Sequence, residues 1–284
     1  MKTKYSFEVF PPRKEMPAEV IYKTLDELTE LKPEFISVTC GAGGTATNAS
    51  ERMIEIAKAI KEKYKRESVA HMPCMNIDRE EAKKILEELE SAGIKKILAL
   101  RGDKVANVEP KGEFNHAIDL IKYIRREKGE KVEIYAACYP EGHTEAEDLE
   151  TDIRYLKEKV EAGVDGLITQ LFFDNESYYY FMEKIRKEKI EVPVEAGIMP
   201  VTNKKQIERM VKICGAKVPV KLRKIIDKYG EDKEAMREAG IIYAQNQITE
   251  LLTNGAEGIH LYVMNNVYVA KKISSAIEKL LEVE

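Results

Sequence analysis

The chain has 284 residues, of which 44% are hydrophobic and 34% are charged, with a net charge of -4 at pH 7. This length suits two small domains or one large barrel, and no linker rich in Pro, Gly or Ser divides it, so we expect one domain over residues 1–284. The acidic balance gives no reason to expect nucleic acid or an anionic membrane as partner. The absence of a signal peptide and of any membrane-length apolar run favours a cytoplasmic protein.

Short apolar runs typical of strands recur along the chain. We expect strands at residues 5–10, 35–40, 69–74, 97–101, 133–139, 166–173, 192–198 and 258–264. Charged segments with helical periodicity lie between them, at residues 18–31, 49–65, 79–92, 115–128, 146–162 and 177–189, and residues 217–254 hold two more helices. Gly93, Gly163 and Gly255 follow helices where a left-handed turn is typical.

This alternation of strands and helices indicates parallel βαβ units. Eight units in this length predict a closed (β/α)8 TIM barrel with extra helices before the last strand. An open doubly wound sheet is the alternative. The GAGG run at residues 41–44 does not fit the G-x-G-x-x-G pattern of a dinucleotide-binding sheet.

Glu8 lies near the end of the first expected strand, just before two prolines stop it. Because side chains alternate along a strand, Tyr5, Phe7 and Val9 form the packing face and Glu8 points to the other face. A carboxylate there is costly to desolvate unless a partner or a task retains it. For this segment alone, a solvated strand end is an equally good interpretation.

Polar side chains recur at the carboxyl ends of other expected strands. In a barrel of parallel strands these ends carry the reactive groups. The residues are Thr39, His71, Arg101, Asp103, Tyr139, His143, Gln170, His260 and Tyr262. Solvation does not readily explain so many polar groups at one end, so we expect a site there.

Several familiar site types are not encoded. The four cysteines form no CxxC pair and the four histidines lack ligand spacing, which argues against a metal or an iron–sulfur cluster in this chain. The sixth strand has no lysine for a Schiff base, and neither a G-x-S-x-G elbow nor a P-loop occurs. Carboxylates, an amide, an arginine, aromatic rings and imidazoles remain, which suit an organic cofactor with a planar ring and a polar tail.

Eight short strings follow one another along nearly the whole chain. They are FEVFPP (7–12), KPEFISVTCGAGG (32–44), HMPC (71–74), LALRGD (98–103), YPEGH (139–143), ITQLFFD (168–174), GIMPVTN (197–203) and GIHLYVMN (258–265). Together they closely resemble the flavin-dependent methylenetetrahydrofolate reductases. The resemblance implies a (β/α)8 barrel that holds FAD, works as a homo- or hetero-oligomer and reduces 5,10-methylenetetrahydrofolate to 5-methyltetrahydrofolate. It leaves open whether the product serves methionine synthesis or acetyl-CoA metabolism.

The resemblance also implies roles for individual residues. Hydride adds to the folate only after its imidazolidine ring opens to an iminium cation, which requires a proton on N10, and Glu8 matches the family's general acid. Asp103 matches a carboxylate that stabilises the cation and lowers the flavin potential. Gln170 matches an amide that orients the pterin. Reduced flavin N5 then delivers hydride in a ping-pong cycle.

The flavin contacts that the resemblance carries over are Thr39, His71, Arg101, Asp103, Ala137, Tyr139, His143, Asp152 and Lys159. Several of them also have a plainer interpretation. Asp152 and Lys159 lie on a charged helix and suit solvent, Arg101 and Asp103 can close a loop as an ion pair, and His71 can be a hydrogen-bonded core histidine.

Two positions depart from the family pattern. Lys204 follows GIMPVTN where many relatives have an aromatic residue, and Asn266 follows HLYVMN where many have arginine. Both fall where reductant and folate would bind, so the electron donor is either NAD(P)H or an iron–sulfur partner subunit. A non-catalytic folate- or flavin-binding barrel and, more distantly, a pterin transferase also remain open.

Overall fold

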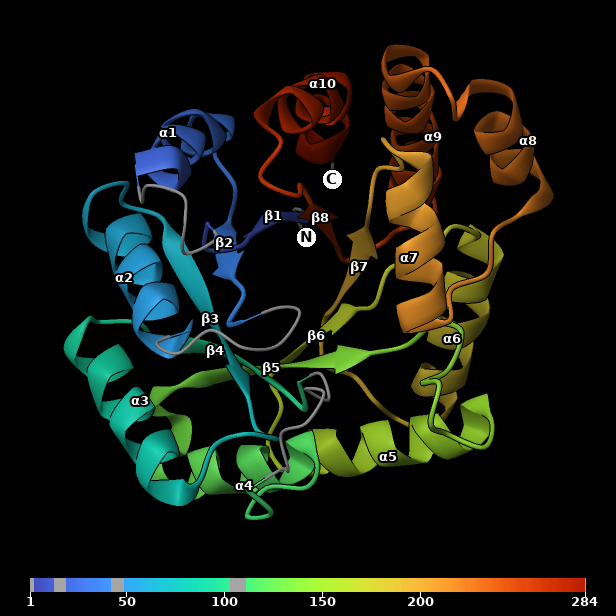
Figure 1. Cartoon of the computed structure of the whole chain (residues 1–284). Coiled ribbons are helices and arrows are strands. Elements are labelled where there is room, and N and C mark those ends of the chain that lie inside the picture. Colours follow the sequence, from blue (N-terminus) through green and yellow to red (C-terminus); the bar gives the residue numbers. More distant parts are fainter. Residues whose placement is uncertain (1–2, 13–18, 42–48, 103–110, 284) are drawn as a thin grey trace. The chain divides into compact units, whose positions relative to one another are not determined.

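A computed structural model describes residues 3–12, 19–41, 49–102 and 111–283 (Figure 1). Eight strands pair in chain order and close into a barrel, which confirms the predicted (β/α)8 fold over the open sheet. The strands are β1 (Lys4–Val9), β2 (Phe35–Val38), β3 (Glu67–Pro73), β4 (Lys96–Leu100), β5 (Glu133–Cys138), β6 (Gly166–Thr169), β7 (Val194–Ile198) and β8 (Gly258–Tyr262).

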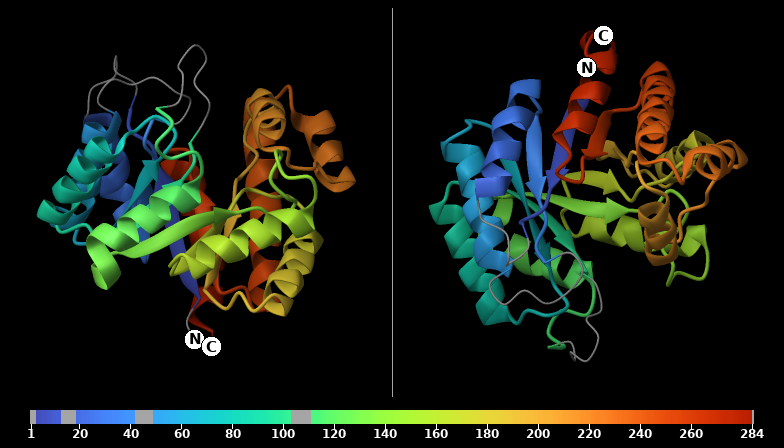
Figure 2. Two further views of the ribbon diagram at one scale, coloured as in Figure 1. Left: turned by 90° about the horizontal axis from the view of Figure 1, so that it is seen from below. Right: turned by 45° about the horizontal axis from the view of Figure 1, so that its top comes forward.

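The helices follow the strands in alternation, as expected. They are α1 (Glu19–Leu28), α2 (Ala49–Glu62), α3 (Arg79–Ser91), α4 (Ala117–Lys128), α5 (Leu149–Glu161), α6 (Asn175–Lys187), α7 (Lys204–Cys214), α8 (Val220–Tyr229), α9 (Lys233–Thr253) and α10 (Val267–Ile277). The two helices expected within residues 217–254 are α8 and α9, which lie side by side (Figure 2). Over the described residues, none of the helices has the length and apolar character needed to span a bilayer.

The chain divides into two compact units. The first unit comprises Met1–Tyr5, Cys138–Lys157 and Ile168–Glu284, and the second comprises Ser6–Ala137 and Glu158–Leu167. The expectation of a single domain stays a prediction.

The second unit confirms the predicted faces of β1. Phe7 and Val9 are fully buried, whereas the Glu8 side chain is 20% exposed. In register, Glu8 lies beside Ser37 of β2, and Ser37 beside Val69 of β3. The carboxyl ends of β1 and β2 therefore lie side by side, and β3 continues for three residues beyond Ala70, the partner of Val38.

Arg125, in the last turn of α4, fastens the amino-terminal ends of β5 and β6 in the second unit. Its guanidinium donates to the carbonyl oxygens of Val132 and Gly163, each at 2.7 Å, and pairs with Asp165. The Asp165 carboxylate also accepts the N–H of Ile134 at 2.7 Å. One planar cation thus ties two loops and a strand together.

Arg186, in the last turn of α6, makes a similar clasp in the first unit. It donates to the carbonyl oxygens of Ile190 and Val192 and pairs with Glu257. The Glu257 carboxylate accepts the N–H of Val194 at 2.7 Å. The amino-terminal ends of β7 and β8 are joined in this way.

Close backbone contacts join β6, β7 and β8 in the first unit. Thr169 Oγ1 accepts the N–H of Gly197 at 2.8 Å, and the Tyr262 hydroxyl donates to the Thr169 carbonyl at 2.7 Å. A Cβ atom on Gly197 would lie 2.2 Å from that carbonyl oxygen. Only glycine fits there.

The predicted end of the sixth strand is wrong, because β6 ends at Thr169 and not at Phe173. The Gln170 N–H still bonds to Cys138, but the Gln170 side chain then accepts the next N–H, so the strand ladder stops. Phe172 and Phe173 are buried, and Phe172 stacks on Tyr178 with ring centroids 5.4 Å apart. Both rings therefore pack in the protein interior.

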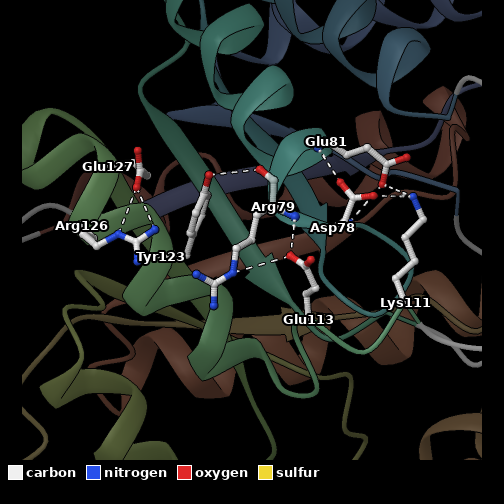
Figure 3. A network of polar contacts seen from close by, with 8 residues as sticks. All are labelled: Asp78, Arg79, Glu81, Lys111, Glu113, Tyr123, Arg126 and Glu127. Carbon is white, nitrogen blue, oxygen red and sulfur yellow. Dashed lines mark hydrogen bonds and ion pairs between the residues drawn. The ribbon is translucent and has the colours of Figure 1, made fainter.

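Helix boundaries follow local capping rules. The expected left-handed turns are confirmed, with φ of 69° at Gly93, 111° at Gly163 and 78° at Gly255. At the start of α3, Asp78 accepts the N–H of Glu81 and Glu81 accepts the N–H of Asp78, a reciprocal capping box (Figure 3). Lys111 pairs with both carboxylates.

Candidate active site

Glu8 of β1 and His71 of β3 lie together in the second unit. Glu8 Oε2 is 3.5 Å from His71 Nε2, and the two side chains are 20% and 9% exposed. Burial raises the pKa of Glu8 to about 8 and lowers the pKa of His71 to about 3, because desolvation disfavours the charged form of each group. Near neutral pH the carboxyl is therefore protonated and the imidazole neutral.

Two buried polar atoms lie at the ends of β2 and β3. Thr39 follows β2 and donates its backbone N–H to Val9 of β1 at 3.0 Å. Within the described residues, neither Thr39 Oγ1 nor His71 Nε2 has a hydrogen-bond partner. Buried polar atoms are normally hydrogen-bonded, so each of these two atoms can serve a polar group of a ligand.

Arg101 follows β4 and is half-buried in the second unit. Its carbonyl accepts the N–H of Met75 at 3.0 Å, which holds the end of β4 against the loop after β3. Gly102 has φ of 87°, and a Cβ atom there would lie 2.8 Å from Pro73 Cβ, so the turn requires glycine. Asp103 lies outside the described residues.

Lys159 of α5 makes a specific contact, contrary to the interpretation that its charged helix suits solvent. Its Nζ donates to the carbonyl oxygen of Ala137, at the end of β5, at 2.8 Å. The structure therefore brings together two of the residues that the resemblance assigned to the flavin. The ammonium group lies at the carboxyl end of a strand, where it can meet an anionic ligand group.

Tyr139, His143 and Asp152 form a group in the first unit. The rings of Tyr139 and His143 meet edge to face with centroids 4.7 Å apart. Asp152 of α5 accepts the backbone N–H of His143 at 3.1 Å, and His143 Nδ1 accepts the N–H of Glu145 at 3.1 Å. The proton of the neutral imidazole is therefore on Nε2, which is a donor.

Gln170 is half-buried directly after β6 in the first unit. Its side-chain oxygen accepts the N–H of Leu171 at 2.9 Å. In the described part of the chain, the amide nitrogen has no protein partner, so Gln170 offers two N–H donors to a ligand. We expected the Gln170 amide both to donate to the pterin and to accept from it. Because its oxygen is already used by Leu171, it serves a ligand mainly as a donor.

The sequence of residues 1–278 matches the family model described as methylenetetrahydrofolate reductase. The chain belongs to this family. A methylenetetrahydrofolate reductase (NADH) of Arabidopsis thaliana is 34% identical over 277 residues, which cover 93% of this chain and 46% of that protein. The chain thus spans about half the length of the plant relatives.

Bacterial members of the family match over most of their length. The 5,10-methylenetetrahydrofolate reductase of Pectobacterium carotovorum is 34% identical, with 94% of this chain and 88% of that protein covered. The Escherichia coli enzyme of the same name is 32% identical with the same coverage.

Solved structures share the fold. A Clostridium thermocellum protein, described as binding two copies of 5-methyl-5,6,7,8-tetrahydrofolic acid, has a TM-score of 0.70 at 14% identity, with 99% of this chain and 96% of that chain covered. A dihydropteroate synthase of Xanthomonas albilineans has a TM-score of 0.54 at 13% identity, covering 100% and 94%. At these identities the likeness concerns the barrel alone.

The two departures from the family pattern each have a structural partner. Lys204, at the start of α7, pairs with Glu231 at 2.8 Å. Asn266 caps α10, because its side-chain oxygen accepts the N–H of Val269 at 3.2 Å. Both residues therefore make local contacts within the first unit.

Sequence reasoning missed two acidic residues of the first unit. Glu195 of β7 is only 2% exposed. Glu141, inside the YPEGH string, is half-buried, and burial raises its pKa. The sequence could have indicated Glu195, because it is a carboxylate inside an apolar strand. It could have indicated Glu141 as well, because this residue lies between a strand and a helix.

Proposed function

We propose that this chain reduces 5,10-methylenetetrahydrofolate to 5-methyltetrahydrofolate with FAD, and that Glu8 is the general acid. The observation that supports this most directly is the burial of the Glu8 side chain, 3.5 Å from His71 Nε2. Its pKa of about 8 keeps the proton on the carboxyl near neutral pH, at the position that matches the family's acid. An exposed glutamate would have lost that proton.

The residues present fit a flavin nucleotide. Thr39 Oγ1 and His71 Nε2 are buried polar atoms without a partner among the described residues, and they suit the polar edge of a flavin ring. Arg101 and Lys159 supply positive charge for a pyrophosphate. Tyr139 supplies an aromatic face and His143 an N–H donor. When bound, FAD supplies the hydride that reduces the folate.

The protein's part in the reaction is to orient the folate and to move one proton. Glu8 gives its proton to N10, the C–N10 bond breaks and the ring opens to the iminium form. Gln170 donates to the pterin and so sets its orientation. The negative charge of Asp103 stabilises the positive charge of the iminium, a role that the family resemblance assigns to this residue.

Replacing Glu8 by Gln tests the proposal. We expect Glu8→Gln to keep bound FAD and its reduction by the donor but to slow folate reduction roughly 10²- to 10⁴-fold, because the amide cannot give up a proton. Stopped-flow spectroscopy at about 450 nm follows the two half-reactions separately. Glu34→Gln, at an exposed acid before β2, is the control. Folate reduction at the wild-type rate in Glu8→Gln would remove Glu8 as the acid.

A second source of electrons is favoured by Lys204. This residue has no ring to stack on a nicotinamide and is paired with Glu231. We propose that a hetero-oligomeric partner with an iron–sulfur cluster can replace NAD(P)H as donor. Rapid bleaching of the flavin by NADH in the isolated chain would favour the self-sufficient enzyme. A chain that holds flavin but never reduces folate would instead be the non-catalytic barrel.

A further inference from the structure

Glu141 joins three segments of the first unit. It lies in the loop between β5 and α5, two residues after Tyr139 and two before His143. Glu141 Oε2 accepts the backbone N–H of Lys217, in the linker between α7 and α8, at 2.9 Å. Glu141 Oε1 accepts from the hydroxyl of Ser177 in α6 at 3.4 Å. The carboxylate is therefore committed to contacts within the protein.

A second contact holds the same two segments together. Gly215 ends α7 with φ of 73°, and a Cβ atom there would lie 2.7 Å from Thr144 Cγ2. The linker thus lies against the β5–α5 loop at Glu141 and again at Thr144. His143 lies between these two contact points along the chain.

The linker itself is firmly anchored. Ala216, between the two contact residues of the linker, is 4% exposed. It belongs to an apolar cluster to which α8 contributes Leu222 and Ile226 and α9 contributes Met236, and whose other members are Leu171, Phe173, Met199, Val201 and Ile207. A segment anchored in a packed core can hold a loop in one conformation.

We propose that Glu141 is a positioning residue that fixes Tyr139 and His143 for flavin binding by fastening their loop to the linker between α7 and α8. This inference rests on the proposed function. It also gives the additional helices α8 and α9 a task, because they contribute side chains to the apolar cluster that anchors the linker. Asp152 accepts the backbone N–H of His143, and Glu141 accepts the backbone N–H of Lys217 in the linker, so two carboxylates restrain this loop.

Release of FAD from the holoprotein tests this role. After dilution, free flavin regains its fluorescence, so the release rate and the dissociation constant are measured without any assay of activity. We expect Glu141→Ala to weaken FAD binding about tenfold, because the loop loses its hydrogen bonds to Lys217 and Ser177 and part of that loss is transmitted to the flavin contacts. Glu141→Gln should restore binding to within about threefold, because its amide can still accept from Lys217 and donate to Ser177.

Two matched controls isolate the contact. Glu147, in the same loop, is exposed, so Glu147→Ala should leave FAD release unchanged. Gly215→Ala should weaken FAD binding as Glu141→Ala does. Gly255→Ala has the same backbone strain, with φ of 78°, but meets nothing within 4 Å among the described residues, and it should release FAD at the wild-type rate.

The results distinguish the two proposals. A wild-type chain that binds no FAD would overturn the proposed function itself. A wild-type chain that binds FAD, with Glu141→Ala releasing it at the same rate, would overturn the positioning role. We also expect the absorption band of the Glu141→Ala holoprotein at about 450 nm to change shape, because the contacts of the flavin change. A general loss of stability would leave the spectrum of the bound flavin unchanged, so this measurement separates the two effects.

Discussion

Burial raises the pKa of Glu8, which fits the general-acid role that we propose for it. The same desolvation that keeps Glu8 protonated keeps His71 neutral, so the two groups form an uncharged pair 3.5 Å apart. Sequence reasoning identified Glu8 because a carboxylate opposite an apolar face is conspicuous. The general-acid role requires a carboxyl pKa raised by burial, but the extent of the rise depends on the tertiary structure around Glu8 and His71.

The pH dependence of folate reduction should report Glu8 directly. The acid acts in its protonated form, so the rate of the folate half-reaction should be constant below about pH 7 and fall about tenfold per unit above about pH 8. Single-turnover oxidation of reduced enzyme by folate, from about pH 6 to about pH 10, measures this. A rate that already declines between about pH 5 and pH 6 would contradict a raised pKa.

The stability of the protein should also depend on Glu8. Its pKa is higher in the folded state, about 8, than the ordinary value of 4.5, so its stabilising contribution is complete below pH 4.5 and is lost as the pH rises to 8. Glu8→Gln does not titrate. We therefore expect it to gain stability relative to wild type between about pH 5 and pH 8.5, by at most about 5 kcal/mol. Urea unfolding at several pH values checks this, and parallel curves would argue against it.

Other site residues show what the sequence could and could not give. The resemblance assigned Lys159 and Ala137 to the flavin site, and the hydrogen bond between them is consistent with their belonging to one site. From the charged helix alone, Lys159 would have been assigned to solvent. Nothing in the linear sequence indicated that the Gln170 oxygen bonds to the next backbone N–H, because that contact depends on where β6 ends.

The positions of strands and helices are predicted better by the periodicity of apolar residues than by any single residue. All eight strands lie where apolar runs predicted them, and the errors are at their ends. The end of β6 depends on a side-chain hydrogen bond, which periodicity does not encode. Helices α7 and α10 were not singled out, although Asn203 and Asn266 cap their amino-terminal ends, because both asparagines were considered only in connection with functional strings.

The cap of α3 provides a test at this scale. Asp78→Ala removes an acceptor for the Glu81 N–H and a partner of Lys111, so we expect a loss of about 1–2 kcal/mol in the free energy of unfolding. Glu80→Ala in the same first turn should cost about 0.5 kcal/mol or less. Thermal and denaturant unfolding of both variants give the comparison. Equal losses would mean that the capping box contributes nothing specific.

Each unit of the molecule contains an arginine clasp at the amino-terminal ends of its strands. Arg125 pairs with Asp165 ahead of β6, and Arg186 pairs with Glu257 ahead of β8. In both, the acid accepts a backbone N–H at the neighbouring strand, and the arginine donates to loop carbonyls. Arg and acid residues were visible in the sequence among many others. Their pairing was not predictable, because the partners are 40 and 71 residues apart.

Arg125→Lys tests the clasp. Lysine keeps the charge but cannot serve two carbonyls and a carboxylate in one plane, so we expect a loss of about 2 kcal/mol or more in stability. The adjacent Arg126 is exposed and forms its ion pair with its neighbour Glu127, so Arg126→Lys should change stability by less than about 0.5 kcal/mol. Denaturant midpoints of the two variants measure the difference. Indistinguishable midpoints would show that the fork geometry of Arg125 is unimportant.

The clasps grip main-chain atoms of the loops that they hold. Val132 and Gly163, and likewise Ile190 and Val192, are recognised by their carbonyl oxygens. Side chains at the carboxyl-terminal ends of the strands, where we propose that ligands bind, can therefore be varied while the two arginines still hold the amino-terminal ends. This barrel should accept libraries aimed at new pterin-like compounds, provided that both arginines and their acidic companions are retained.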